Sequence, residues 1–191
     1  MKRMLSCALL GATLAVTGCD TGEEAGGDPQ FLGALSANVS TFTTSPGGCV
    51  VSAIFDDDRV EWRPGETAAN GRTTKARKRG LTLAVPASAA GATVKVDVRG
   101  SYMTAGSGAS AAATLSVAGR STAIRLPDGK AQNEYFQSVA APIPAGARTV
   151  AVMIETSAPK PEDPAAEVTL DVDSLDIALD SKPACGRPAG G

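Results

Sequence analysis

Few side chains in this sequence have the chemistry for catalysis, because the 191-residue chain contains no histidine. That absence removes serine–histidine and cysteine–histidine nucleophilic catalysis, together with the usual zinc hydrolases. A pair of carboxylates could still hydrolyse a glycosidic bond. Glu61, Glu134 and Glu155 are the acidic residues near the centre or end of an expected strand, but their spacing singles out no pair. We therefore predict that the chain is not an enzyme.

The densest acidic cluster is the run Asp56, Asp57 and Asp58. Together with Asp171 or Asp173, its carboxylates could supply the oxygen ligands that Ca²⁺ prefers. The alternative is a solvated turn between two strands, and this is the interpretation that we favour. We therefore predict no bound metal and no cofactor.

One basic cluster lies between residues 72 and 79. Cationic side chains at this density could bind lipid headgroups, the phosphates of lipopolysaccharide, or an acidic glycan. The alternative, which we favour, is a solvated polar loop between two strands. The members of the cluster are Arg72, Lys75, Arg77, Lys78 and Arg79.

Trp62 is the only tryptophan of the chain. Its neighbours Glu61 and Arg63 are charged, so an exposed indole at this position could stack on a sugar ring. A lone tryptophan in a small domain is more often part of the core. Trp62 is therefore a candidate ligand contact, with a core position as the favoured alternative.

The first 18 residues have the composition of an export signal. Lys2 and Arg3 form a short positive segment, and residues 4–16 are all apolar or small. This run has the length of a signal-peptide core and is too short to span a bilayer as a helix. The sequence Val16-Thr17-Gly18-Cys19 resembles the lipobox of bacterial lipoproteins, which implies cleavage before Cys19 and lipid on its thiol. The alternative is an ordinary signal peptide.

The segment that follows the expected cleavage site is predicted to be a flexible tether. Residues 19–30 contain no aromatic or large apolar side chain, so this segment cannot pack into a core. Residues 31–185 are then expected to form one domain, and residues 186–191 a disordered tail. Removal of the signal peptide leaves 16 basic and 20 acidic side chains. This mildly acidic balance gives no reason to expect nucleic-acid binding.

Two cysteines remain in the expected domain, Cys49 and Cys185. An even number of cysteines in an exported protein favours a disulfide, and the alternative is two free thiols. A zinc site is not expected, because two isolated cysteines without histidine cannot supply four ligands.

Short apolar or alternating segments separated by turn residues predict an all-β domain of about eight or nine strands, a β-sandwich of the jelly-roll type. Between Val172 and Leu175 the apolar alternation shifts by one residue, which predicts a β-bulge near Asp173 and Ser174. The expected strands cover residues 49–55, 59–63, 81–85, 94–98, 114–117, 123–126, 134–139, 148–154 and 168–172.

Three stretches of the second half resemble the galactose-binding-like jelly roll found in carbohydrate-binding modules. They are the strand pair within residues 80–100, the strand–turn–strand segment 135–150, and segment 168–179. The resemblance implies binding of a sugar or polysaccharide, often beside a structural calcium. We therefore expect a lipid-anchored protein of the bacterial cell envelope, in the inner or outer membrane, that binds a polysaccharide or another envelope component. The alternative is a structural or assembly subunit that binds another envelope protein.

Overall fold

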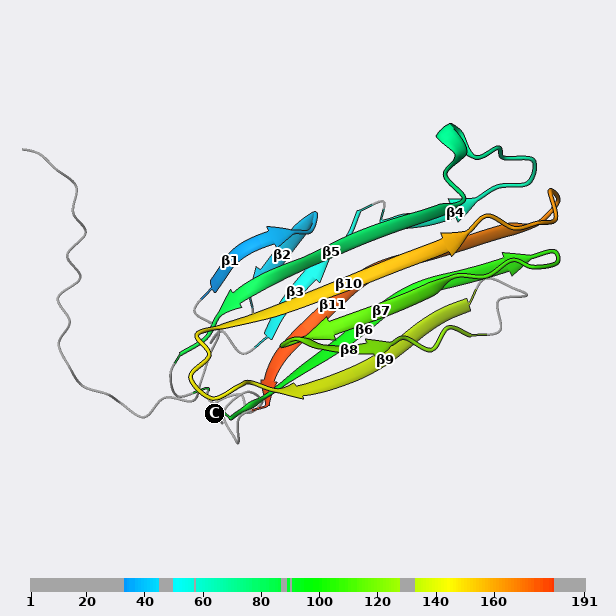
Figure 1. The fold of residues 1–191 in the computed structure, drawn as a ribbon. Coiled ribbons are helices and arrows are strands. Elements are labelled where there is room, and N and C mark those ends of the chain that lie inside the picture. The colour runs from blue at the N-terminus through cyan, green and yellow to red at the C-terminus, as the bar shows by residue number, and fades with distance from the viewer. Residues whose placement is uncertain are drawn as a thin grey trace, which may run out of the picture.

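The computed structural model describes residues 33–44, 50–56, 58–86, 89, 91–127 and 133–180, and this part of the chain is built almost entirely of β-strands (Figure 1). The one other regular element is a short 3₁₀ turn, η1. The predicted signal peptide, Cys19, the tether, Asp57 and both Cys49 and Cys185 lie outside the described residues. Among the described residues, no helix is long and apolar enough to span a membrane.

The elements follow one another as β1 (Gly33–Asn38), β2 (Thr41–Thr44), β3 (Val50–Ile54), β4 (Arg59–Trp62), η1 (Ala69–Gly71), β5 (Thr74–Ala84), β6 (Thr93–Ala105), β7 (Ala112–Val117), β8 (Arg120–Ala123), β9 (Asn133–Pro142), β10 (Thr149–Pro159) and β11 (Glu167–Asp180).

The strands form two antiparallel sheets packed face to face. Sheet A has the order β1-β5-β10-β7-β8, and sheet B has the order β2-β3-β11-β6-β9, with β4 also paired to β11. The expected all-β sandwich is therefore confirmed. The sheets stay together because strands such as β6, β7 and β10 alternate between apolar side chains facing the partner sheet and more polar or more exposed side chains on the outer face.

Strand β6 shows this alternation directly. Val94, Val96 and Val98 have 0% exposure, while Lys95 and Arg99 point to solvent. Each fully buried valine contributes about 1.5–3 kcal/mol of hydrophobic stabilisation. The period-two pattern in the sequence therefore fixes which face of sheet B forms the core.

The predicted bulge in β11 is also confirmed. The register of β11 against β6 shifts between Val172 and Ser174. On the other side of β11, β4 pairs with residues 168–171 and β3 pairs with residues 174–178. The carbonyl of Asp173 accepts a hydrogen bond of 3.0 Å from the backbone N–H of Phe55, which leads out of β3. The bulge thus lies where the neighbouring strand of β11 changes from β4 to β3.

The structure adds two strands to those expected and shifts another. The described residues contain eleven strands, because β1 and β2 form at the start of the domain, where the sequence has little apolar alternation. The expected strand 123–126 is instead β8, Arg120–Ala123. Strand β8 forms a tight hairpin with β7, in which Arg120 lies opposite Val117.

We expected the basic cluster to be a loop, but most of it lies in a strand. Lys75, Arg77, Lys78 and Arg79 lie in β5, which starts at Thr74 and pairs with β10 along its whole length. Strand β10 continues to Pro159, which pairs with Thr74. The backbone of β10 therefore holds the charged half of β5 in a strand, although the sequence of that half does not predict one.

The two ends of the described domain lie at one pole of the sandwich. Gly33 pairs with Ala84 at the end of β5, and Asp180 pairs with Thr93 at the start of β6. The connection from β4 through η1 to β5 lies at the opposite pole (Figure 1). At about 3.3 Å per residue, the 11 residues of β5 place the two poles roughly 30 Å apart.

Candidate functional site: a cationic groove between two sheet edges

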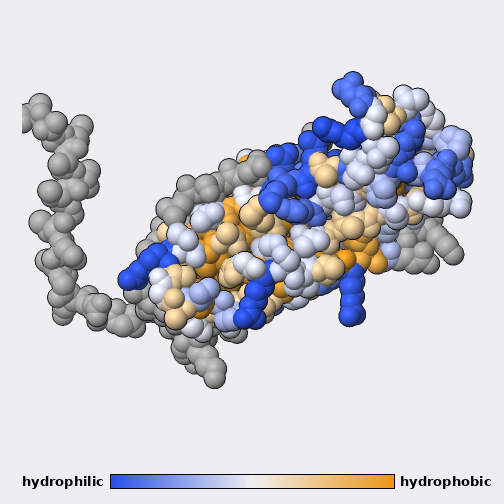
Figure 2. All heavy atoms as spheres, in the orientation of Figure 1, coloured by the Kyte–Doolittle hydropathy of each residue, from blue (hydrophilic) through white to orange (hydrophobic). Residues whose placement is uncertain are grey.

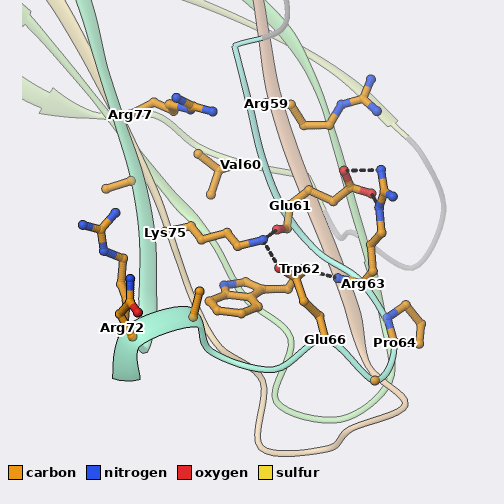
Figure 3. A pocket seen from close by; sticks show the side chains of 14 residues that line it. Arg59, Val60, Glu61, Trp62, Arg63, Pro64, Glu66, Arg72, Lys75 and Arg77 are labelled. Carbon is orange, nitrogen blue, oxygen red and sulfur yellow. Dashed lines mark hydrogen bonds and ion pairs between the residues drawn. The ribbon is translucent and has the colours of Figure 1, made fainter.

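A groove with a volume of about 960 Å³ lies between β4 and the first half of β5, at the pole opposite the ends of the domain (Figure 3). It exists because both sheets have an open edge here. Strand β1 pairs only with Gly80–Ala84 of β5, so Thr74–Arg79 has β10 on one side and no described strand on the other. Strand β4 pairs only with β11 among the described strands.

Trp62 forms the floor of the groove, and only 2% of its surface is exposed. Its indole N–H donates a 2.9 Å hydrogen bond to the carbonyl of Ala158, which joins β4 of sheet B to β10 of sheet A. The ammonium of Lys75 lies 4.4 Å from the ring centroid. The structure therefore places Trp62 in the core, and a sugar ring could stack on it only after displacing Lys75.

Lys75 crosses the groove from β5 towards β4 (Figure 3). Its ammonium donates hydrogen bonds to the carbonyl oxygen of Glu61, at 2.6 Å, and to the carboxylate of Glu66, at 2.5 Å. The second oxygen of Glu66 accepts the backbone N–H of Arg63 at 3.2 Å. Lys75 thus fixes the loop after β4 and shields the indole of Trp62 at the same time.

Both carboxylates of the groove are held in the charged form. The hydrogen bond from Arg63 to Glu61, 2.7 Å from Nε to Oε1, lowers the pKa of Glu61. The hydrogen bond from Lys75 lowers the pKa of Glu66. A carboxylate with a lowered pKa stabilises the fold above its unfolded pKa, and this stabilisation is lost as the pH falls through the folded pKa. The internal ion pairs of the groove are therefore intact at neutral pH.

The described side chains that line the groove carry excess positive charge. Arg59, Arg63, Arg72, Lys75 and Arg77 face only two lining carboxylates, which gives a net charge of +3. The pole that holds the groove is strongly hydrophilic on the face shown in Figure 2. Because low-dielectric walls focus the field of such charges, the groove should attract negative charge.

The acidic run differs from both interpretations of the sequence. Asp58 is only 1% exposed, and its carboxylate pairs with Nε of Arg79 at 3.1 Å, so it belongs neither to a solvated turn nor to an open set of calcium ligands. Asp56 is exposed, and its backbone N–H donates to the hydroxyl of Ser40. The described residues contain no group of three or more side chains arranged to hold a metal ion.

Strand β11 contributes two more acids near the bulge. Asp171 forms an ion pair with Arg59, with a distance of 3.3 Å between the guanidinium nitrogen and the carboxylate oxygen. The pKa of Asp173 is raised mainly by partial burial and, to a smaller extent, by the negative charge of Asp171. Asp171 therefore belongs to an ion pair that joins β11 to β4.

We predict that Arg79→Met lowers the free energy of unfolding by about 2–4 kcal/mol, because it leaves the carboxylate of Asp58 buried without a partner. Urea unfolding followed by circular dichroism measures the change. The double variant Arg79→Met/Asp58→Asn should recover part of the loss. Equal stability of Arg79→Met and the unmodified chain would contradict a buried ion pair.

The three candidate catalytic acids do not come together. Glu61 lies on β4 and Glu134 on β9, and β11 and β6 separate these two strands in sheet B. Glu155 lies on β10 of sheet A and forms an ion pair with Lys78. The structure therefore offers none of these pairs for glycosidic hydrolysis.

Sequence reasoning missed Glu66, Arg59 and Arg63 as groove residues. Their positions depend on the pairing of β4 with β11 and on the turn after Arg63, where the N–H of Gly65 donates to the carbonyl of Pro164. Pro64 and Gly65 signalled a turn, but nothing in the sequence indicated which segment the turn would contact.

The fold and the groove define a β-sandwich domain with a polar, cationic groove at one pole. No protein-family model and no curated protein matches the chain. A solved structure that resembles it is described as a family 35 carbohydrate-binding module from an environmental isolate. The identity is 16%, the match covers 84% of this chain and 93% of that one, and the TM-score is 0.32. Similarity at this level carries no argument about the ligand.

Proposed function

We propose that this chain is a lipid-anchored protein of the bacterial cell envelope whose β-sandwich binds an envelope polysaccharide without transforming it. The observation that carries the proposal is the groove of about 960 Å³ at the pole opposite the ends of the domain. The lack of histidine and the separation of the three acids support binding without catalysis.

The position of the groove fits an anchored receptor. Lipid on Cys19 would hold the chain at the membrane, and the tether of residues 19–30 leads to Gly33 at one pole. The groove lies at the other pole, roughly 30 Å away. An extended polymer could reach a site in this position without contacting the bilayer.

The anchor is tested by Cys19→Ser, which we expect to release the protein from the membrane fraction, because the thiol that would carry lipid is absent. Cys7→Ser is the matched control, since Cys7 lies within the expected signal peptide, and it should leave the protein membrane-bound. Fractionation of cells followed by immunoblotting measures both. Membrane retention of Cys19→Ser would overturn the anchor.

Polysaccharide binding is tested with the full chain in detergent, applied to a panel of immobilised neutral and acidic polysaccharides. We expect saturable binding to at least one polysaccharide. Competition by the same polysaccharide in solution separates specific binding from adhesion to the surface. Absence of binding across the panel would overturn the proposal.

A second candidate function, binding of another envelope protein, is favoured by one observation. The segment Thr74–Arg77 of β5 pairs with β10 on one side and with no described strand on the other, and such an edge can accept an added strand. The basic residues on this segment resist the addition of a second copy of itself, so an added strand would need acidic side chains. A photo-reactive side chain at Ala76 should then crosslink to a protein in intact membranes.

A further inference from the structure

We infer that the groove selects anionic polysaccharides, and that Arg72 and Arg77 are the residues that impose this selection. The inference rests on the proposed function and names the class of polysaccharide. The ligand class consists of linear polymers that carry carboxylate, sulfate or phosphate groups.

The charges of the groove divide into a neutralised set and an uncompensated set. Lys75 pairs with Glu66, Arg63 pairs with Glu61, and Arg59 pairs with Asp171. Within the described part of the chain, Arg72 and Arg77 form no ion pair with a carboxylate. The fold therefore leaves two positive charges in the groove for a ligand to neutralise.

Both side chains are exposed, so a ligand can reach them. An arginine binds a carboxylate, sulfate or phosphate through two parallel hydrogen bonds, which fixes the orientation of the anion as well as its charge. Both residues lie on the β5 side of the groove, Arg72 directly after η1 and Arg77 within β5 (Figure 3).

The spacing of the two arginines favours a polymer over a single small ion. Arg72 has extended backbone angles, φ −71° and ψ 112°, and β5 begins at Thr74. At about 3.3 Å per residue, the α-carbons of Arg72 and Arg77 are roughly 16 Å apart. Each guanidinium can therefore bind a different anionic group of one extended chain.

The other common means of sugar recognition is blocked in this groove. Among the described residues that line it, Trp62 is the only aromatic one, and its indole is buried beneath Lys75. Removal of Lys75 from the ring would break its hydrogen bonds to Glu61 and Glu66. The groove can therefore select a ligand by charge, but it cannot bind a sugar by stacking on an aromatic face.

The positive charge is a local property of the groove. The whole chain has a formal net charge of −2, so it has no general attraction for polyanions. A polyanion that binds should therefore do so at this pole. Its affinity should fall with rising salt, because the contacts are between charges near the surface.

The test compares Arg72→Gln/Arg77→Gln with Arg120→Gln/Arg125→Gln, using the full chain in detergent. Both double variants remove two positive charges, but Arg120 and Arg125 are exposed and do not line the groove. The probes are polygalacturonate, dextran sulfate and neutral dextran, with phosphatidylglycerol vesicles as a further arm. Circular dichroism and thermal unfolding confirm that both variants fold.

We expect the unmodified chain to bind polygalacturonate or dextran sulfate at least tenfold more tightly than dextran. The groove variant should lose at least tenfold in affinity, and the control variant less than twofold. Stronger binding to a neutral polysaccharide would overturn charge selection and leave polysaccharide binding intact. Equal losses in both variants would overturn the assignment to this groove, and binding to the vesicles alone would overturn polysaccharide binding. Absence of binding to every polysaccharide tested would overturn the proposed function itself.

Discussion

Trp62→Ala should lower the free energy of unfolding by about 3–5 kcal/mol, because it removes a large buried side chain and leaves a cavity. The indole is 2% exposed and joins the two sheets through its 2.9 Å hydrogen bond to Ala158. The substitution also leaves that carbonyl without its donor and takes away the surface on which Lys75 lies. Urea unfolding followed by far-ultraviolet circular dichroism measures the loss.

Two variants separate the causes of this loss. Trp62→Phe retains an aromatic ring but no N–H donor, so we expect a smaller loss of about 1–3 kcal/mol. Phe136→Ala is the control for aromatic area, because Phe136 is 60% exposed and should contribute less than about 1 kcal/mol. If Trp62→Ala cost no more than Phe136→Ala, the core position of Trp62 would be wrong.

The single tryptophan also reports on the groove in the unmodified chain. An indole buried beneath Lys75 should emit at short wavelength and resist quenching by acrylamide. Binding of a polyanion to Arg72 and Arg77 should leave this protection in place, because the ligand has no need to reach the ring. An increase in quenching on binding would mean that Lys75 moves aside, and stacking would then have to be reconsidered.

The parts of the fold that the sequence predicted are those that follow from alternation along a strand. Val94, Val96 and Val98 identify the buried face of β6 because successive side chains point to opposite faces of a sheet. The same rule located the bulge between Val172 and Ser174, where the buried set changes phase. Both inferences needed only neighbours in the sequence.

The groove was not predictable in this way, because long-range pairing creates it. The sequence around Lys75 and Arg77 has no recognisable strand pattern. This segment is a strand because it pairs with β10. The burial of Asp58 depends on Arg79, which lies 21 residues away. The sequence identified the basic cluster and Trp62 separately, and only the packing of β4 against β5 brings them into one site.

The described interactions also suggest why the groove stays open. Strand β1 ends its pairing with β5 at Gly80, and the side chains of Lys75 and Arg79 are then held by acids from the loops that flank β4. Charged residues on an exposed edge discourage the pairing of strands between molecules. Arg72 and Arg77, which form no ion pair with a described carboxylate, leave positive charge beside this edge for a ligand.

Gly100→Ala should destabilise the domain by about 3 kcal/mol or more, because the added methyl group has no space in a packed core. A β-carbon at Gly100 would lie 2.1 Å from the carbonyl oxygen of Asp171 and 2.5 Å from the hydroxyl of Tyr135. Gly100 lies on β6, directly opposite Tyr135 of β9, so the phenol ring crosses this glycine to reach β11. Its hydroxyl donates a 3.0 Å hydrogen bond to the carbonyl of Asp171.

The two contacts of the added methyl group can be separated. Ser101→Ala, one residue along the strand and on the outer face, is the matched control and should change stability by less than about 1 kcal/mol. Tyr135→Phe should relieve the contact with the hydroxyl, but the backbone carbonyl of Asp171 remains. We therefore expect Gly100→Ala/Tyr135→Phe to stay clearly less stable than Tyr135→Phe alone in urea unfolding. Equal stability of these two variants would show that the sheet can shift at this point, and that Gly100 is not required for the close approach of β6 and β11.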